Sequence, residues 1–399
     1  MCYNCVNNHE YIFFKKSGEK FMFKKINRAF QDYMREKRLR LGKYIWDRKR
    51  DKEEIKSGNF IEKNNIKKIL FMRYDGKIGD MVINTLMFRE IKKKYPYIEI
   101  GVVTKGGAKA VIENNPNVDK IYEYKKDRKS IKKLSLEIAA EKYDLLIDFS
   151  EMLRVNQMML INLCKARFNM GLNKENWKIF DISYTKPTGY IHVTEIYKNI
   201  LEKLGIKNID ISYELFFIER QKSKIEELLK KLKHKKIVVF NPFAASKHRN
   251  INLENIVKIG KIILEDENNI LMFIGEEKRK KELENVMREL GNNTFFPEFK
   301  DIMETSYLIS KADLVITPDT SIVHISAAFK RKLIAIYRID GKAENEINRY
   351  LWGPNYKEAV QIFSKDFAIK NGEEPDINKF DMKELENEIK KYLRKQEKI

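Results

Sequence analysis

Residues 312–337 read ADLVITPDTSIVHISAAFKRKLIAIY, and this run indicates how the chain folds. Residues 314–317 are a short apolar run flanked by turn residues, which predicts a buried strand. Pro318 is expected to end that strand, and Asp319 or Thr320 can cap the helix that follows. The helix is indicated by residues at helical spacing, namely Ile322, Ile325, Ser326 and Phe329. Residues 333–337 predict the next buried strand, so the unit is strand, turn, helix, strand.

Such a turn has a chemical consequence at the start of its helix. The free N–H groups and the positive end of the helix dipole point into the crevice beyond the strand ends, where anions bind in open α/β sheets. Thr320, Ser321 and His324 add hydrogen-bond donors there. The alternative interpretation is an ordinary, well-capped βαβ turn, because spacing alone does not separate the two.

The run DTSIVHISAA, residues 319–328, resembles the D-T-G-x-x-H-x-x-A-A signature of glycosyltransferase family 9, the bacterial heptosyltransferases. The resemblance implies that this turn and helix hold the nucleotide diphosphate of a sugar donor. The positions that match are Asp319, Thr320, His324, Ala327 and Ala328, and Ile322 falls at a position that is usually apolar. Ser321 stands where the family usually has Gly; its Cβ resists positive φ, but its hydroxyl can compensate.

Length and composition set the broad class. A chain of 399 residues favours two domains over one core, and 43% hydrophobic residues argue against disorder. Neither a run of about 18 apolar residues nor a signal-peptide pattern occurs, so we expect a cytoplasmic chain without a spanning helix. The net charge of +21 fits a nucleic acid, an anionic membrane or a phosphorylated substrate as partner.

The charge is concentrated near the N-terminus. Residues 15–56 carry sixteen Lys and Arg against seven Asp and Glu, a net charge of +9. Apolar residues recur there at helical spacing, which predicts a basic amphipathic helix or helix pair; they are Phe23, Ile26, Phe30, Tyr33, Met34, Leu41, Tyr44 and Ile45. Three interpretations stay open: packing on the body or a second subunit, attachment to the anionic inner leaflet, and nucleic-acid binding.

Ahead of this segment, Cys2 and Cys5 form a lone C-x-x-C with His9 nearby. A zinc site usually needs a second pair of ligands, and Cys164 is far along the chain. We therefore expect no metal at this end.

The first α/β unit follows, with a strand predicted at 69–73, a loop at 74–79 and a helix at 80–94. The loop is neither a dinucleotide fingerprint nor a Walker A loop. Asp80 at the helix start can be an N-cap, or a carboxylate that takes a proton from a hydroxyl. The text RYDGKIGDMVINT resembles the corresponding loop of family 9, which implies that Asp80 is the catalytic base.

The connector NPNVDKIYEY also resembles the family, and the basic run YKKDRKSIKK overlaps its end. In the heptosyltransferases this region supplies cations to the anionic inner core of lipopolysaccharide. The resemblance therefore implies an acceptor-binding role for Lys125, Lys126, Arg128 and Lys129. The alternative is a solvated charge run.

After a passage at 209–233 that reads as charged and largely helical, the second α/β domain opens with a strand at 237–240. The loop NPFAASKHRN that follows carries Lys247, His248 and Arg249, which could clamp a diphosphate. Family 9 has a comparable loop, and the resemblance carries Lys247 and Arg249 over as donor-binding residues. Beyond a strand at 270–274, Glu276 or Glu277 could bond ribose hydroxyls or cap the next helix.

Together these motifs predict two Rossmann-like domains that face each other across a cleft, the GT-B arrangement. The predicted parts are an N-terminal basic helical extension (1–65), an acceptor domain (66–215), a nucleotide-sugar domain (235–365) and a helical tail (366–399). The implied function is inverting, metal-independent transfer of a sugar, with ADP-heptose as donor and a lipopolysaccharide core as acceptor. Consistent with metal independence, the sequence has no D-x-D pair. A nucleic-acid-binding protein and a non-catalytic sugar-nucleotide binder remain as alternatives.

Overall fold

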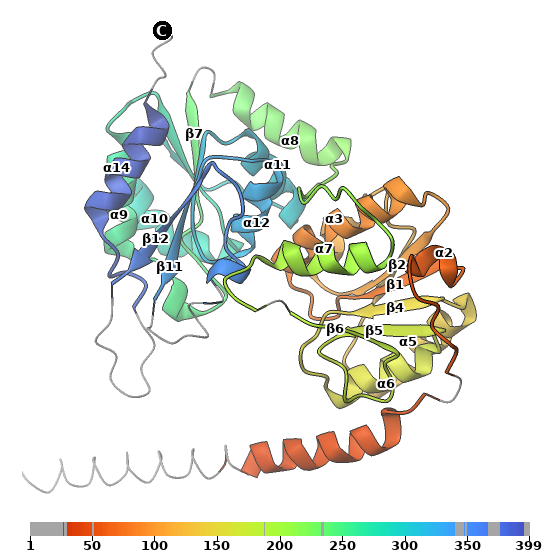
Figure 1. Ribbon diagram of the computed structural model, residues 1–399. Helices are drawn as coiled ribbons and strands as arrows, with labels where there is room; N and C mark the ends of the chain where they lie inside the picture. Colours follow the sequence, from red (N-terminus) through yellow and green to blue (C-terminus); the bar gives the residue numbers. More distant parts are fainter. Residues whose placement is uncertain are drawn as a thin grey trace, which may run out of the picture.

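The computed structural model describes residues 27, 30–49, 52–186, 188–232, 235–339, 347, 349–365 and 376–394. Two α/β halves lie side by side, each built on a six-stranded parallel sheet with helices on its faces (Figure 1). This arrangement confirms the predicted fold class. Cys2, Cys5, His9, Phe23 and Ile26 lie outside the described residues.

The N-terminal half has the strand order β3-β2-β1-β4-β5-β6, and each neighbouring pair is parallel. Its strands read as continuous apolar runs because helices cover both faces of the sheet. The elements are α2 (Phe60–Lys63), β1 (Lys68–Met72), α3 (Ile78–Lys94), β2 (Glu99–Thr104), α4 (Gly107–Ile112), β3 (Lys120–Glu123), α5 (Arg128–Glu141), β4 (Leu145–Asp148), α6 (Val155–Cys164), β5 (Phe168–Leu172), β6 (Ile182–Tyr184) and α7 (Val193–Lys203).

The C-terminal half repeats this order with its own strands, β12-β11-β10-β7-β8-β9, again all parallel. Its elements are α8 (Glu219–Lys230), β7 (Lys236–Phe240), η1 (Lys247–Arg249), α9 (Leu253–Leu264), β8 (Asn269–Phe273), η2 (Glu277–Arg279), α10 (Lys280–Leu290), β9 (Thr294–Phe295), α11 (Ile302–Lys311), β10 (Leu314–Pro318), α12 (Ser321–Ala328), β11 (Leu333–Arg338), β12 (Ala359–Ser364) and α14 (Met382–Leu393).

The strand order reverses between β1 and β4 in one sheet and between β7 and β10 in the other. Open α/β sheets bind ligands beyond the carboxyl ends of their strands at such a switch point. The loop after β1 leads into α3 and the loop after β10 leads into α12, so each half places a helix start at its switch point. The two helix starts meet, because a Cβ built on Gly79 would lie 3.4 Å from the Cα of Ser321.

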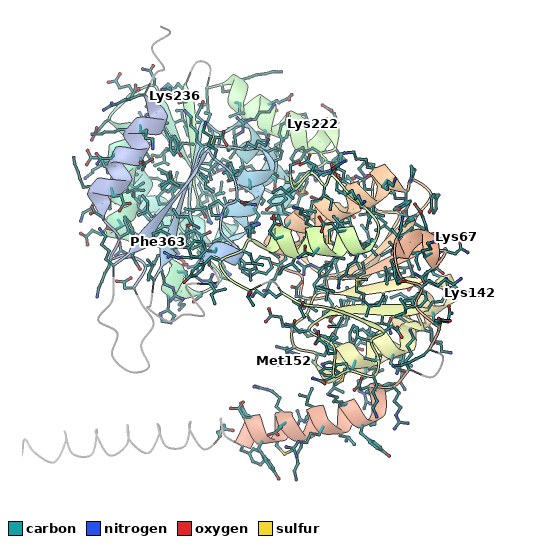
Figure 2. The ribbon with its side chains drawn as sticks, in the orientation of Figure 1. Lys67, Lys142, Met152, Lys222, Lys236 and Phe363 are labelled. Atoms are coloured by element: carbon teal, nitrogen blue, oxygen red, sulfur yellow. The ribbon has the colours of Figure 1, made fainter. Side chains whose placement is uncertain are left out.

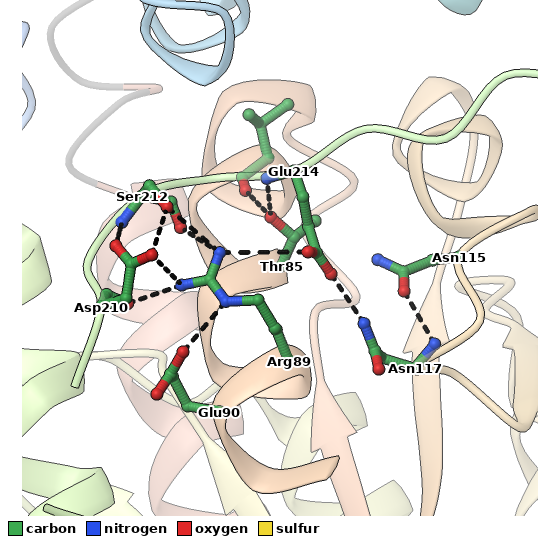
Figure 3. A network of polar contacts seen from close by, with 9 residues as sticks. Thr85, Arg89, Glu90, Asn115, Asn117, Asp210, Ser212 and Glu214 are labelled. Carbon is green, nitrogen blue, oxygen red and sulfur yellow. Dashed lines mark hydrogen bonds and ion pairs between the residues drawn. The ribbon is translucent and has the colours of Figure 1, made fainter. Parts of the chain in front are cut away.

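An extended connector joins the halves. The sequence predicts a largely helical passage at 209–233, but residues 209–218 are extended and α8 begins only at Glu219. The physical reason is that the connector finds its hydrogen-bond partners on α3 (Figure 3). Arg89 donates to the carbonyl oxygens of Ser212 and Asp210, at 2.8 and 2.6 Å, and Thr85 Oγ1 accepts from the Glu214 N–H at 3.1 Å.

Residues 30–46 form one helix, which we call the N-terminal helix. Its C-terminal end lies beside α6 of the N-terminal half (Figure 1). Leu39 and Trp46 pack against an apolar cluster of that half. Gly42 faces Val155 so closely that a Cβ would lie 2.6 Å from Cγ2 of that valine. No helix within the described residues combines the length and apolar character that crossing a bilayer requires.

Lysine side chains project from both halves of the molecule, as the labelled Lys67, Lys142 and Lys222 show (Figure 2). Residues 15–56 carry +9 of the formal net charge of +21, so the rest of the chain still carries +12. Charge alone therefore does not locate a binding site.

Candidate active site

A cavity of about 1050 Å³ lies between the halves, at the two switch points. Its walls include the start of α3 from the N-terminal half and the start of α12 from the C-terminal half. The loops after β7, β8 and β10, the start of α11 and the end of β11 also line it. The structure brings eight of the sequence-predicted site residues to this cavity: Asp80, Arg249, Glu276, Asp319, Thr320, Ser321, Ile322 and His324.

Asp80 is the third residue of α3, and its side chain is only 13% exposed. It does not cap the helix, because α3 begins two residues earlier than predicted and Lys77 holds the N-cap position. Its carboxylate instead forms an ion pair with Arg73, whose Nη2 is 3.2 Å from Oδ2. Burial raises the pKa of Asp80, and the neighbouring Arg73 guanidinium opposes that rise. The carboxylate is thus held in place with one side toward the cavity.

Arg73 is itself fixed. It is 5% exposed, donates to the Tyr197 hydroxyl at 3.3 Å, and lies over the Phe149 ring at 5.0 Å from the centroid. Sequence reasoning missed this residue as part of the site. The signal was available, because Arg73 stands at the end of the first strand in the quoted run RYDGKIGD.

Thr320 is the N-cap of α12, and its hydroxyl accepts from the Ile322 N–H at 3.3 Å. Asn241, at the end of β7, holds that hydroxyl group from the other side: its Nδ2 donates to Thr317 Oγ1 at 3.0 Å and to Thr320 Oγ1 at 3.3 Å. The helix start is therefore oriented by side chains of two neighbouring strands. Asn241 is a second residue that sequence reasoning did not single out.

Asp319 does not cap the helix. It accepts a hydrogen bond of 2.9 Å from Arg249 Nη1, which also donates to the Asp319 carbonyl at 3.3 Å. Burial raises the pKa of Asp319, and Arg249 counteracts this. The Nε of Arg249 is buried without a hydrogen-bond partner among the described residues. The pair presents a positioned guanidinium with unused donor capacity at the cavity wall.

His324 is buried at the contact between α3 and α12. A Cβ on Gly79 would lie 2.5 Å from its Cδ2 atom, so the two helix starts approach as closely as a glycine permits. Burial lowers the pKa of His324 to about 3, so its imidazole ring is uncharged at neutral pH and lines the cavity without adding charge. His192 caps α7, and its Nε2 lies 3.1 Å from the Gly353 carbonyl oxygen, in the other half.

The cavity suits an anionic ligand. The dipoles of α3 and α12 both place their positive ends there. Among the described lining residues, six are Lys or Arg and four are Asp or Glu. The cations are Lys77, Arg249, Lys278, Arg279, Arg338 and Arg349.

Several predicted residues lie outside this cavity. Lys247 is exposed in η1 and is not part of the lining. Lys125, Lys126, Arg128 and Lys129 are exposed where β3 leads into α5 and also lie outside it.

Of the two candidate ribose ligands, Glu276 lines the cavity, where it forms an ion pair with Lys278, and Glu277 does not line it. Within the residues that the structure describes, no three His, Cys, Asp or Glu side chains are grouped so that they could hold a metal ion.

Comparison with known proteins gives a consistent picture. The family model described as glycosyltransferase family 9 (heptosyltransferase) matches residues 131–371, which is more than half of the chain. A curated relative, the lipopolysaccharide core heptosyltransferase OpsX of Haemophilus influenzae, is 22% identical over 326 residues. That match covers 78% of this chain and 90% of the relative.

Two solved structures share the fold. A glycosyl transferase of family 9 from Veillonella parvula superposes with a TM-score of 0.68 at 16% identity, over 82% of this chain and 97% of that one. The ADP-heptose lps heptosyltransferase II of Escherichia coli gives a TM-score of 0.64 at 15% identity, over 82% and 98%. These likenesses establish the two-domain arrangement across nearly the whole length of both relatives.

Proposed function

This chain belongs to glycosyltransferase family 9, and from that premise we propose that it transfers a heptose from ADP-heptose to a lipopolysaccharide core, with inversion of configuration and without a metal ion. The observation that supports this reaction is that the two halves bring a carboxylate and an anion-binding helix start to the same cavity. Asp80 comes from the N-terminal half, and the capped start of α12 with Arg249 comes from the C-terminal half.

In the proposed step, the acceptor hydroxyl gives its proton to the Asp80 carboxylate as its oxygen bonds to the anomeric carbon of the sugar. The bond from that carbon to the diphosphate oxygen breaks, and its electron pair leaves with the diphosphate. A single displacement from the face opposite the leaving group inverts the anomeric centre. The α12 N–H groups, the Thr320 and Ser321 hydroxyls and Arg249 would stabilise the charge on the departing diphosphate.

The positive charge for this step would come from the protein itself. A helix N-terminus and a guanidinium in a sheltered cavity can stabilise an anionic leaving group without a Lewis acid. This is why the proposal assigns no metal ion to the reaction.

The choice of donor draws on the printed name of the Escherichia coli relative, which contains ADP-heptose. Glu276, just beyond β8 and on the cavity wall, is proposed to bond the ribose hydroxyls of the nucleotide. The name of the Haemophilus relative supports a lipopolysaccharide core as acceptor. Lys125, Lys126, Arg128 and Lys129 are proposed to meet its anionic groups. Because that acceptor is a glycolipid, the proposal includes contact with the cytoplasmic face of the inner membrane.

The test begins with a thermal-shift screen of nucleoside diphosphates, followed by a transfer assay with the sugar donor of the nucleotide that stabilises the protein most. We expect ADP to give the largest shift, and nuclear magnetic resonance of the product to show an inverted anomeric centre. Donor binding without transfer or hydrolysis would contradict the proposal and favour a non-catalytic binder.

Asp80→Asn tests the base directly. It should lower kcat by about 10²–10⁴-fold while the Kd for ADP changes by no more than about threefold, because the change removes the proton acceptor and keeps the shape. Glu113→Gln is the control, since Glu113 is an exposed carboxylate outside the cavity lining. Equal losses of turnover and ADP binding in Asp80→Asn would instead give Asp80 a structural role.

A further inference from the structure

The N-terminal helix has two different faces. At 100° per residue, one half of its circumference carries the apolar and basic residues Phe30, Tyr33, Met34, Lys37, Arg38, Arg40, Leu41, Tyr44 and Ile45. We call this half the outer face. The two acidic residues of the helix, Asp32 and Glu36, both fall on the opposite half with Leu39, Gly42 and Trp46.

From Leu39 onward, the opposite half is docked on the protein. Leu39 and Trp46 pack against the core, and Gly42 lies against Val155 of α6. Asn162 Nδ2 donates to the Trp46 carbonyl at 2.9 Å, while the buried Asp47 accepts from the Ile179 N–H at 2.9 Å. These contacts fix the rotation of the helix about its own axis, so the outer face has a set direction.

That direction is toward the solvent, because the large apolar side chains of the outer face are exposed. Leu41 is 61% exposed and Tyr44 is 74% exposed, and Phe30, Tyr33 and Ile45 are exposed as well. One helix therefore combines a docked face with a second row of apolar side chains that has no cover among the described residues. Ordinary surface helices have one apolar stripe, so the second row needs its own explanation.

The charges next to this row are positive. The ammonium of Lys37 lies 4.8 Å from the Tyr33 ring centroid, and the guanidinium of Arg48 lies 5.1 Å from that of Tyr44. The acidic side chains of the helix are already paired with basic ones, Asp32 with Arg35 and Glu36 with Arg40. Aromatic rings with a polar tip and long basic side chains are the residues that suit a lipid–water interface.

We propose that the outer face binds an anionic lipid bilayer, with the helix axis parallel to the surface. The apolar row would enter the headgroup region while the flanking Lys and Arg meet lipid phosphates. A nucleic acid would use the cations but gives no reason to expose Leu41 and Ile45. The inference does not depend on the proposed reaction, because it concerns a surface outside the cavity lining and a lipid that is neither donor nor acceptor.

The test is flotation of the full chain with vesicles of phosphatidylcholine alone or mixed with phosphatidylglycerol. The unchanged protein should bind the phosphatidylglycerol vesicles at least about tenfold more strongly, and added salt should weaken the binding. Leu41→Ser with Tyr44→Ser should lose at least about tenfold of this binding. The matched control is Leu136→Ser with Tyr97→Ser, whose side chains are 72% and 62% exposed elsewhere in the N-terminal half; it should stay within about twofold.

A pair of charge reversals tests the electrostatic contribution to vesicle binding. Lys37→Glu with Arg38→Glu should abolish the preference for phosphatidylglycerol. Lys230→Glu with Lys281→Glu, which makes the same change of net charge on the C-terminal half, should leave most of the preference. Every altered residue is exposed, so we expect all variants to unfold at the temperature of the unchanged protein. That result would exclude loss of folding as the cause of weaker binding.

Three results would overturn the proposal. The first is unchanged vesicle binding by Leu41→Ser with Tyr44→Ser, and the second is tight binding of duplex DNA by a protein that does not bind the phosphatidylglycerol vesicles. The third is a concentration-dependent dimer that this variant loses, which would assign the outer face to a second copy of the chain. A protein that binds vesicles but transfers no sugar would leave this inference standing and contradict only the proposed reaction.

Discussion

Replacing Arg73 with Met should move the acid limb of the pH–rate profile of transfer to higher pH. Arg73 is 5% exposed and its Nη2 lies 3.2 Å from the Asp80 carboxylate, so the substitution leaves a buried carboxylate without its nearest cation. With the two charge centres roughly 4 Å apart and an effective dielectric constant of about 20, the lost attraction is about 4 kcal/mol. Lys77 and the α3 dipole remain, so this figure is an upper bound.

Without Arg73, Asp80 holds a proton more often at pH 6, so kcat/KM should be reduced by about 10–100-fold there. The rate should recover as the pH is raised, because Asp80 then loses that proton. The assay is the initial rate of transfer from pH 5 to 9, with ADP binding measured in parallel. Arg73→Lys is the control, since it keeps the charge and should shift the limb much less. If the limb does not move in Arg73→Met, or if Arg73→Lys fails to the same degree, the reasoning about charge is refuted.

Three further changes test other parts of the site. Arg249→Met should weaken ADP binding by about 10–100-fold, the loss expected for one charge-assisted hydrogen bond. Lys247→Met should change ADP binding by less than about threefold. Titration calorimetry of both variants shows which of the two cations binds ADP. Gly79→Ala should destabilise the protein by about 1–3 kcal/mol in urea unfolding, because the new methyl group meets the buried His324 ring; unchanged stability would refute the close contact. His324 has a pKa of about 3 in the folded protein against about 6.5 when unfolded, so the unfolded chain takes up the proton first and stability falls as the pH drops below about 6.5. Between pH 6.5 and 5 the loss is roughly 2 kcal/mol, which His324→Gln should remove, while His192, with a pKa of about 4, should contribute a similar slope that remains.

Much of the fold was predictable because parallel strands in this class are buried on both faces and read as apolar runs. Strands predicted at 69–73, 237–240, 270–274 and 333–337 correspond to β1, β7, β8 and β11 within a residue or two at each end. The connector was not predictable, since its charged residues suit a helix as well as they suit ion pairs with α3. Only the tertiary contacts of Arg89 decide between the two.

For the site, the sequence predicted residues that belong to a motif. It missed Arg73 and Asn241, which orient Asp80 and Thr320 by direct contact. Asp80 and Thr320 are far apart along the chain, yet both follow a strand at a switch point and both line the cavity. The sequence predicted both Lys247 and Arg249 as donor-binding residues, because it does not show which residue of η1 reaches the cavity. Only the second of them lines the cavity, in contact with Asp319. The donor and acceptor roles of these residues stay predictions.

The hydrogen bonds from Arg89 to residues 210 and 212 attach the first part of the connector to α3. Glu214 is tied to α3 through Thr85, whereas Phe217 packs edge-to-face against Tyr307 and stacks on Phe329 of the C-terminal half. Within the described residues the chain crosses between the halves once, and residues 215 and 216 lie between these two attachments. If the two halves rotate against each other, α3 and Asp80 would therefore move with the connector up to Glu214, and Phe217 would move with the C-terminal half.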